Sequence, residues 1–406
     1  MKKILKTLSA YVILSLSYLP TLTASKLFPE FSKIDLLITN GQVLDGLGNK
    51  VVLSDVVIVG DEIVFVGQTN FSTEELRLRV KKSINAKQRI LAPGFIDLHS
   101  HGDPLAKIVG KNDRLIMSHM RNEDSDQLSA SIAELVRQGQ FAKVHISHIK
   151  SVYGAGDSEA EDIIKIFRYA KKSGIQLSAD IYPYNASYAG ISLLFPVWAK
   201  TTEQFVVVLK ERREELEQFL RDKIIKRNGP EATLLGTSPY TGKTLADLAK
   251  EFDMAYEQVL IKLGPKGASA AYFIMDDELQ SRLLVEPQIS ISSDGSPIGF
   301  HPRRHGTFAK IIEQYVNQRN SLSLTEAVRK MTSEAAKILG ITDRGIIRAG
   351  MKADIIIFDP SQIKANASYS KPHLLAQGFD TVIINGNIAR QSEKMNTALF
   401  GKVLKP

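Results

Sequence analysis

Between residues 89 and 340, apolar segments of β-strand character alternate with segments whose apolar residues recur every three to four positions. This alternation predicts βα units, and it constrains the fold strongly, because strands joined through helices lie parallel in a sheet that helices cover. A long, mostly helical insertion is expected at 200–286. We expect the central strands at 90–101, 114–119, 143–150, 175–184 and 287–295.

The two ends of the chain are rich in short strands instead. Residues 25–88 contain β-like runs separated by glycine turns, and residues 341–406 contain hairpin-like segments of the same kind. We expect these two parts to close into one small β-sandwich beside the α/β unit. A capped helix is predicted at 323–339, with Ser323 or Thr325 as its N-cap.

Residues 1–24 are typical of a secretory signal peptide. Lys2, Lys3 and Lys6 form a basic start, and an apolar stretch from Leu8 to Leu19 is followed by small residues. The apolar stretch is short for a membrane span, so we expect cleavage and a periplasmic or secreted product. An uncleaved membrane anchor is the alternative.

Composition excludes several classes of protein. The chain has no cysteine, which rules out disulfides, cysteine-ligated zinc, iron–sulfur clusters and a thiol nucleophile. The net charge is +8, but beyond residues 1–24 no block of five like charges occurs, and the aromatic residues do not interleave with a basic stripe. Nucleic-acid binding is therefore disfavoured. An anionic substrate or a solvated basic surface would account for the excess of positive charge.

Histidines gather at the carboxyl ends of the predicted strands, where parallel α/β folds carry their chemistry. His99 and His101 alternate along one strand, so their side chains point the same way and suit one divalent metal ion. His119 and His148 end two further strands whose spacing suits neighbouring βα units. His145 lies three residues before His148 and points to the other face, which favours a structural role.

Asp294 is the remaining carboxylate at the end of a predicted strand. A carboxylate beside zinc can bind the metal and also move protons, because the ion sets the pKa of its bound water. Together with the histidines, Asp294 predicts a metal site at one edge of the sheet. The alternative is a set of ordinary polar residues at strand ends.

Several motifs, in the same order along the chain, resemble the amidohydrolase superfamily and specifically its N-acyl-D-amino-acid deacylase (D-aminoacylase) family. PGFIDLHSHGD resembles the first-strand signature of the superfamily, and SHMRNE, HISHIK, DIYPYNAS and SDGSPIGFHPRRHGTF resemble the deacylase branch itself. GIIRAGMKADIIIFDP resembles the return into a composite sandwich. The resemblance implies a zinc-dependent (β/α)₈ barrel with a small composite β-sandwich from both termini.

The resemblance also implies roles for individual residues. His119 and His148 would bind the tightly held Zn²⁺. His99, His101 and Asp294 would surround a second, weaker metal position. Asp294 would take a proton from the zinc-bound water and pass it to the departing amine.

In the same comparison, Lys150, Tyr182 and Arg303 would hold the α-carboxylate of the substrate. A point charge, a phenol donor and a bidentate fork suit that task; solvated rim charges and simple packing of the tyrosine are the alternatives. The implied reaction is hydrolysis of an N-acyl-D-amino acid to a carboxylate and a D-amino acid. This small-molecule substrate is the expected partner, with neither nucleic acid nor a stable membrane partner.

The likeness has one gap. Only the 17 residues 102–118 separate His101 from His119, whereas a single βαβ unit takes about 30 or more. Three strands of the family's barrel and its bridging cysteine would lie there; Asp103 is the nearest replacement by position and Lys107 a weaker one. We therefore expect an incomplete barrel whose sheet stays open or associates through its edges.

The gap leaves two readings of function open. The first is an active deacylase, and the second is a catalytically impaired or inactive pseudoenzyme of the same family that lacks the bridging metal ligand. A different amidohydrolase, such as a relative of dihydroorotase, fits the motifs less well.

Overall fold

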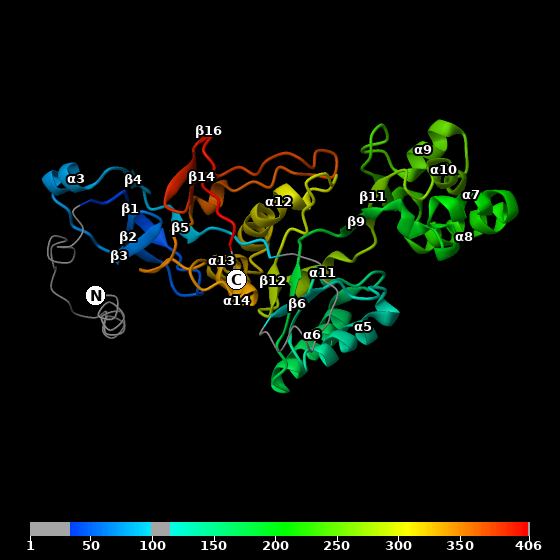
Figure 1. The fold of residues 1–406 in the computed structure, drawn as a ribbon, viewed down its shortest axis with the longest axis horizontal. Coiled ribbons are helices and arrows are strands. Elements are labelled where there is room, and N and C mark those ends of the chain that lie inside the picture. The colour runs from blue at the N-terminus through cyan, green and yellow to red at the C-terminus, as the bar shows by residue number, and fades with distance from the viewer. Residues whose placement is uncertain (1–32, 99–113, 405–406) are drawn as a thin grey trace.

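A computed structural model of the chain describes residues 33–98 and 114–404. Figure 1 shows three parts along the long axis of the molecule: a sheet built from both chain ends, a parallel sheet with its helices, and a helical insertion at the far end. The signal peptide predicted at 1–24, and the predicted ligands His99 and His101, lie outside the described residues.

The largest sheet joins the two ends of the chain. The strand order is β16-β15-β14-β13-β5-β1-β2-β3, with β4 also paired to β1. The two halves meet where β5 pairs antiparallel with β13, and buried aliphatic side chains from both halves form one core. The strands are β1 (Leu36–Val43), β2 (Val52–Val59), β3 (Glu62–Gly67), β4 (Ser83–Asn85), β5 (Ile90–Pro93), β13 (Ile355–Phe358), β14 (Phe379–Ile384), β15 (Asn387–Gln391) and β16 (Lys394–Met395), and the helix α3 (Thr73–Arg79) precedes β4.

Within the strand predicted at 90–101, residues 90–93 form β5 of this sheet, so their assignment to the central parallel sheet was wrong. Residues 94–98 form no strand, and residues 99–101 lie outside the described residues. Ile90 and Leu91 pair with β1 on one side and with β13 on the other. Their burial explains the apolar run, which completes the core of the large sheet. The strand ends at Pro93, which has no N–H to donate to a ladder.

The parallel sheet contains the other four predicted strands, in the order β12-β8-β7-β6. All three pairings are parallel. Among residues 33–98 and 114–404 this sheet does not close, and β6 and β12 are its edges, as expected for an incomplete barrel. The strands are β6 (Leu115–Ser118), β7 (Lys143–Ile146), β8 (Leu177–Ile181) and β12 (Ile289–Ile291).

Amphipathic helices cover this sheet. In α6, for example, the buried residues recur at helical spacing and form one apolar stripe: Ala160, Ile163, Ile164, Phe167 and Ala170. The helix predicted at 323–339 begins at Ser323, whose hydroxyl accepts the Glu326 N–H, but it breaks at Thr332 into two helices. The helices are α5 (Ser125–Gln138), α6 (Gly156–Lys172), α11 (Asp277–Val285), α12 (Arg303–Lys310), the π-helix η4 (Ile311–Gln318), α13 (Leu324–Met331) and α14 (Ser333–Leu339).

The insertion has a hydrophobic core of its own. It is less purely helical than expected, because a three-stranded antiparallel sheet of order β10-β11-β9 packs with its helices. No helix in the described parts of the chain is both long and apolar enough to span a membrane. The elements are β9 (Ala186–Gly190), α7 (Thr202–Glu211), α8 (Arg213–Lys226), β10 (Thr233–Leu235), α9 (Leu245–Phe252), α10 (Tyr256–Leu263) and β11 (Ser269–Phe273), with short 3-10 turns η1 (Ile191–Leu194), η2 (Val197–Ala199) and η3 (Pro230–Ala232) among them and η5 (Pro360–Gln362) near β13.

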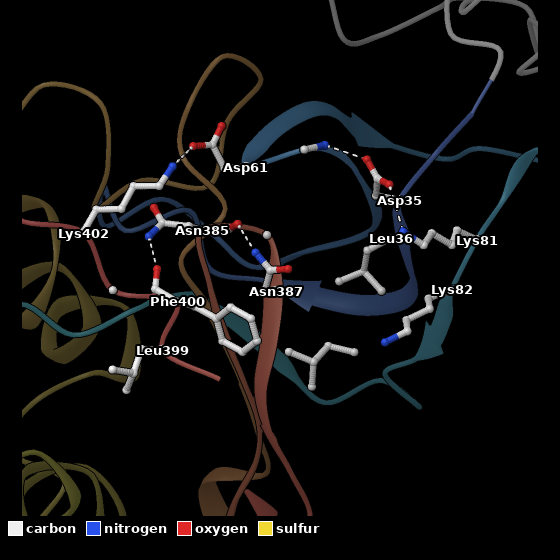
Figure 2. A pocket seen from close by; sticks show the side chains of 14 residues that line it. Asp35, Leu36, Asp61, Lys81, Lys82, Asn385, Asn387, Leu399, Phe400 and Lys402 are labelled. Carbon is white, nitrogen blue, oxygen red and sulfur yellow. Dashed lines mark hydrogen bonds and ion pairs between the residues drawn. The ribbon is translucent and has the colours of Figure 1, made fainter. Parts of the chain in front are cut away.

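The C-terminal segment packs against the turn between β2 and β3 (Figure 2). Lys402 Nζ donates to Asp61 at 2.8 Å, and Asn385 Nδ2 donates to the Phe400 carbonyl at 2.7 Å. Lys352 Nζ donates to the other oxygen of Asp61 at 2.9 Å. Hydrogen bonds from Lys402 and Lys352 lower the pKa of Asp61 from 3.8 to about 2.

This shift predicts a pH-dependent contribution to stability. Because the pKa is lower in the folded chain, the contribution is complete above pH 4 and is lost as the pH falls toward 2. We expect Asp61→Asn to reduce the free energy of unfolding at pH 5 and to differ progressively less from the wild type at pH 4 and pH 3. Urea denaturation at each pH measures it, with the exposed Asp126→Asn as control. A difference that is independent of pH would contradict the prediction.

Candidate metal centre and active site

The carboxyl ends of β6, β7, β8 and β12 meet at one edge of the parallel sheet, because the four strands run in the same direction. A cavity of about 610 Å³ opens there. All the predicted site residues within the described ranges line it: His119, His148, Lys150, Tyr182, Asp294 and Arg303. The structure therefore brings together side chains that are up to 184 residues apart in the sequence.

His119, Glu123 and His148 form a group whose potential ligand atoms all lie within 4.8 Å of one another. The two imidazole rings are 4.6 Å apart, and the Nδ1 atom of each lies 3.3 Å from Glu123 Oε1. Sequence reasoning missed Glu123, although it lies in SHMRNE, four residues after His119. Two imidazole nitrogens and one carboxylate oxygen are a ligand set that zinc accepts in proteins.

The Lys150 ammonium lies within this group. Its Nζ is 2.6 Å from Glu123 Oε1 and 2.7 Å from His148 Nδ1. The Lys150 side chain is only 5% exposed and that of Glu123 16%, so the pair is shielded from water. A cation thus already occupies a position between the imidazole and the carboxylate, and this shows that the donors fit a positively charged ion.

The opposite charges of Glu123 and Lys150 shift the pKa of each side chain so that its charged form is favoured. Burial raises the pKa of Glu123, but the charge of Lys150 and the hydrogen bond from His148 outweigh it and hold that pKa below its usual range. Burial lowers the pKa of Lys150, and the charge of Glu123 outweighs it, so that pKa is raised. The pair is therefore ionised at neutral pH.

A second charged pair lies on the opposite side of the sheet edge. Arg303 Nη1 is 2.5 Å from Asp294 Oδ2, and both side chains are largely buried. The guanidinium also stacks over the Tyr182 ring at 4.8 Å. The backbone N–H of Arg303 donates to His301 Nδ1 at 3.1 Å, and His301 Nε2 lies 3.1 Å from the Ala186 carbonyl. Burial, followed by the charge of Arg303, lowers the pKa of His301, so this ring is a neutral spacer that positions Arg303.

The Tyr182 hydroxyl is buried and has no hydrogen-bond partner among the described residues. Burial raises its pKa, although Lys150 and Arg303 act against that shift, so the phenol keeps its proton and remains a donor. An unpaired donor of this kind costs free energy unless a ligand supplies the acceptor.

The backbone holds two of the site residues in an uncommon conformation. His148 has φ of 40° and Asp294 has φ of 46°, in the left-handed region that side chains other than glycine rarely adopt. Both follow the last residue of a parallel strand by two or three positions. Such strained positions gather at functional sites, where the surrounding structure holds them.

Asp180 on β8 supports His148 from the sheet. Its Oδ1 accepts the His148 backbone N–H at 2.9 Å and the Ser292 hydroxyl, and its Oδ2 lies 2.8 Å from His145 Nε2. His145 is fully buried and is not among the residues that line the cavity, in keeping with the structural role interpreted from its position. Asp180, like Glu123, was not identified from the sequence, although it lies in the DIYPYNAS motif.

Three basic residues of the insertion side line the wall of the same cavity: Lys200, Lys223 and Arg227. Arg227 is buried, stacks over the Tyr272 ring at 4.7 Å and donates to the Tyr153 hydroxyl at 3.3 Å. Its Nε has no partner among the described residues. The wall is therefore suited to a negatively charged group.

Sequence comparisons bear on this arrangement. A sequence profile of the amidohydrolase family matches residues 282–390. The chain is 34% identical over 168 residues to an N-acyl-D-aspartate deacylase of Alcaligenes xylosoxydans xylosoxydans, a match that covers 41% of this chain and 33% of that protein. It is 26% identical over 301 residues to an N-acyl-D-glutamate deacylase of the same organism, covering 72% of this chain and 55% of that protein. The chain thus spans between one third and just over half of the length of these relatives.

A solved structure is also similar. The N-acyl-D-glutamate deacylase of Bordetella bronchiseptica, crystallised with zinc and a phosphonate inhibitor, superposes with a TM-score of 0.72 at 19% identity, covering 88% of this chain and 96% of that one. This likeness confirms the predicted fold class, a metal-dependent-hydrolase (β/α)₈-type fold with a composite β-sandwich. The names of the relatives agree with the family that the motifs resemble, and that resemblance is confirmed.

The buried network around Asp180 yields a prediction. Asp180→Ala removes the acceptor for the His148 N–H and Ser292 and the partner of His145, and we expect it to lower the free energy of unfolding by about 3 kcal/mol or more. Urea denaturation measures the change. The matched control is Asp162→Ala, which removes an exposed ion pair with Lys165 and should change stability by less than about 0.5 kcal/mol. A loss below about 1 kcal/mol for Asp180→Ala would contradict this role.

Proposed function

We propose that this chain, which belongs to the amidohydrolase superfamily, is a metal-dependent hydrolase that cleaves the amide bond of N-acyl-D-amino acids. The observation that carries the proposal is the content of one cavity. A ligand group of two histidines and a glutamate lies beside a buried aspartate and three donors suited to a carboxylate. A pseudoenzyme that does no chemistry is the alternative, and it draws no support from relatives that are named as deacylases.

The donors would orient the substrate. Lys150 and Arg303 would pair with its α-carboxylate, and the buried Tyr182 hydroxyl, which has no partner among the described residues, would donate a hydrogen bond to the same group. Donors after the ends of β7 and β8 and at the start of α12 fix a carboxylate in position and direction. The neighbouring amide would then lie over the His119 and His148 imidazoles, and this positioning lowers the barrier to attack.

His119 and His148 would hold the metal ion, with Zn²⁺ as the cofactor that fits the donor set. When bound, the ion would supply an activated water and would polarise the amide carbonyl. Asp294 would accept the proton of the attacking water and return it to the amide nitrogen as the C–N bond breaks. The products would be a carboxylate and a free D-amino acid, so the reaction consumes one water and balances without another co-reactant.

The basic wall supports a narrower substrate class. Lys200, Lys223 and Arg227 would face the side chain of a substrate whose α-carboxylate is held by Lys150 and Arg303. An acidic side chain would find complementary charge there, whereas an apolar one would gain no such pairing. We therefore propose N-acyl derivatives of D-aspartate or D-glutamate as the preferred substrates.

The first prediction concerns the proton carrier. With added zinc, the full-length protein should release D-glutamate from N-acetyl-D-glutamate, and Asp294→Asn should lower kcat by at least about 100-fold, because the acceptor of the water proton is lost. An assay of D-amino-acid release measures it. Asp222→Asn, exposed on α8, is the control and should retain full activity. Absence of turnover in the wild-type protein across N-acyl-D-amino acids, with zinc present, would refute the proposed function.

A second prediction concerns the basic wall. Lys223→Ala should raise KM for N-acetyl-D-glutamate by about tenfold, because one cation facing the side-chain carboxylate is lost, and should leave KM for N-acetyl-D-leucine nearly unchanged. Steady-state kinetics with both substrates measures the difference. Lys210→Ala, on the exposed face of α7, is the matched control. Equal changes for the two substrates would place Lys223 outside the side-chain pocket.

A further inference from the structure

We propose that Glu123 is a ligand of the metal ion at His119 and His148, and that the ion and the Lys150 ammonium take turns at this carboxylate. The metal ion would thereby release Lys150 for the substrate. The inference rests on the metal dependence of the proposed function, and it goes further by naming a carboxylate ligand and an exchange between two cations.

The geometry brings the carboxylate to the metal position. One oxygen, Glu123 Oε1, lies 3.3 Å from the Nδ1 atoms of both His119 and His148. These separations are similar to those between neighbouring ligand atoms of a tetrahedral zinc site, so the three donors can surround one ion. His119, Glu123 and His148 are the group of histidine and acidic side chains, among the described residues, whose ligand atoms all lie within 4.8 Å of one another.

The composition makes a carboxylate the natural third donor. The chain contains no cysteine, so no thiolate can complete a site that two imidazoles begin. Glutamate together with two histidines is a ligand set found in zinc hydrolases. Glu123 lies four residues after His119, just before α5 begins at Ser125. The same loop therefore carries both His119 and Glu123.

Lys150 contacts the same carboxylate in this structure. Its Nζ contacts both Glu123 Oε1 and His148 Nδ1, which are two of the donors that the metal ion would use. A metal ion and an ammonium cannot share these atoms, because the two positive charges would lie within a bond length or two of each other. Binding of the ion therefore requires Lys150 to leave.

The cavity offers the Lys150 ammonium another position, away from Glu123. Lys150 lines the same cavity as Arg303 and Tyr182, and its flexible four-carbon stem allows the ammonium to turn away from Glu123. There it can pair with an anionic substrate. The exchange keeps every buried charge compensated, since the carboxylate gains the metal ion and the ammonium gains the substrate's carboxylate.

Zinc titration of the metal-free, full-length protein by isothermal calorimetry tests the proposal without any activity measurement. We expect Glu123→Gln to weaken zinc binding by at least about tenfold. Lys150→Met should tighten it, because the competing cation is removed. In the Glu123→Gln background the same change should tighten it less, because only the Lys150 contact with His148 Nδ1 is then relieved. The matched control is Glu134→Gln, whose exposed carboxylate pairs with Arg121; it should leave zinc affinity unchanged.

The outcomes separate this inference from the proposed function. Unchanged zinc affinity in Glu123→Gln, with circular dichroism showing a folded protein, overturns the carboxylate ligand. Weaker zinc binding in Lys150→Met overturns the exchange. If the zinc affinities follow the expectation but no N-acyl-D-amino acid is hydrolysed, the metal site stands and the proposed function falls. If hydrolysis occurs and Glu123→Gln binds zinc as the wild type does, only the inference falls.

Discussion

Four ionised side chains lie largely buried at one sheet edge, and each can remain there because an opposite charge lies within hydrogen-bond distance. Lys150 pairs with Glu123, and Arg303 pairs with Asp294. Removing one member of such a pair leaves an uncompensated charge at a cost of about 3–5 kcal/mol. The pairs also hold cations and anions beside one another, so a metal ion and an anionic ligand can enter by exchanging partners without leaving any charge alone.

The parallel sheet makes these charge pairs possible, because its register places the carboxyl ends of strands that are distant in the sequence at one edge of the sheet. Asp180 on β8 is the clearest case, since its carboxylate binds the His148 backbone after β7 and Ser292 after β12. The large sheet performs a different task. It ties the first and last parts of the chain together through the β5–β13 pairing, and a hydrophobic core shared with the parallel sheet fixes the position of the site's helices.

Local patterns in the sequence predicted much of this fold and the position of several site residues. Short apolar runs that end in polar residues predicted the strands β6, β7, β8 and β12. The serine before an amphipathic segment predicted the N-cap at Ser323. Residues 90–93 of the strand predicted at 90–101 were assigned to the wrong sheet, because a buried strand has the same apolar sequence in either sheet and only its long-range partner, β13, distinguishes them. Glu123 was missed for a related reason. An acid in the loop before a helix is usually solvated, and only the position of His148 and Lys150 from another strand turns it inward.

The left-handed backbone at His148 and Asp294 sets stability and chemistry against each other. Glycine is the residue that fits such a φ without strain, so a glycine at either position would relax the backbone while deleting a side chain from the cavity. At His148, selection for a more heat-resistant protein would therefore favour glycine, and selection for turnover would oppose it. At Asp294, glycine would also leave the buried Arg303 without its partner, and that loss outweighs the relief of backbone strain. Among variants that drift without a substrate to act on, His148 is the position where loss of function would be accompanied by a gain in melting temperature.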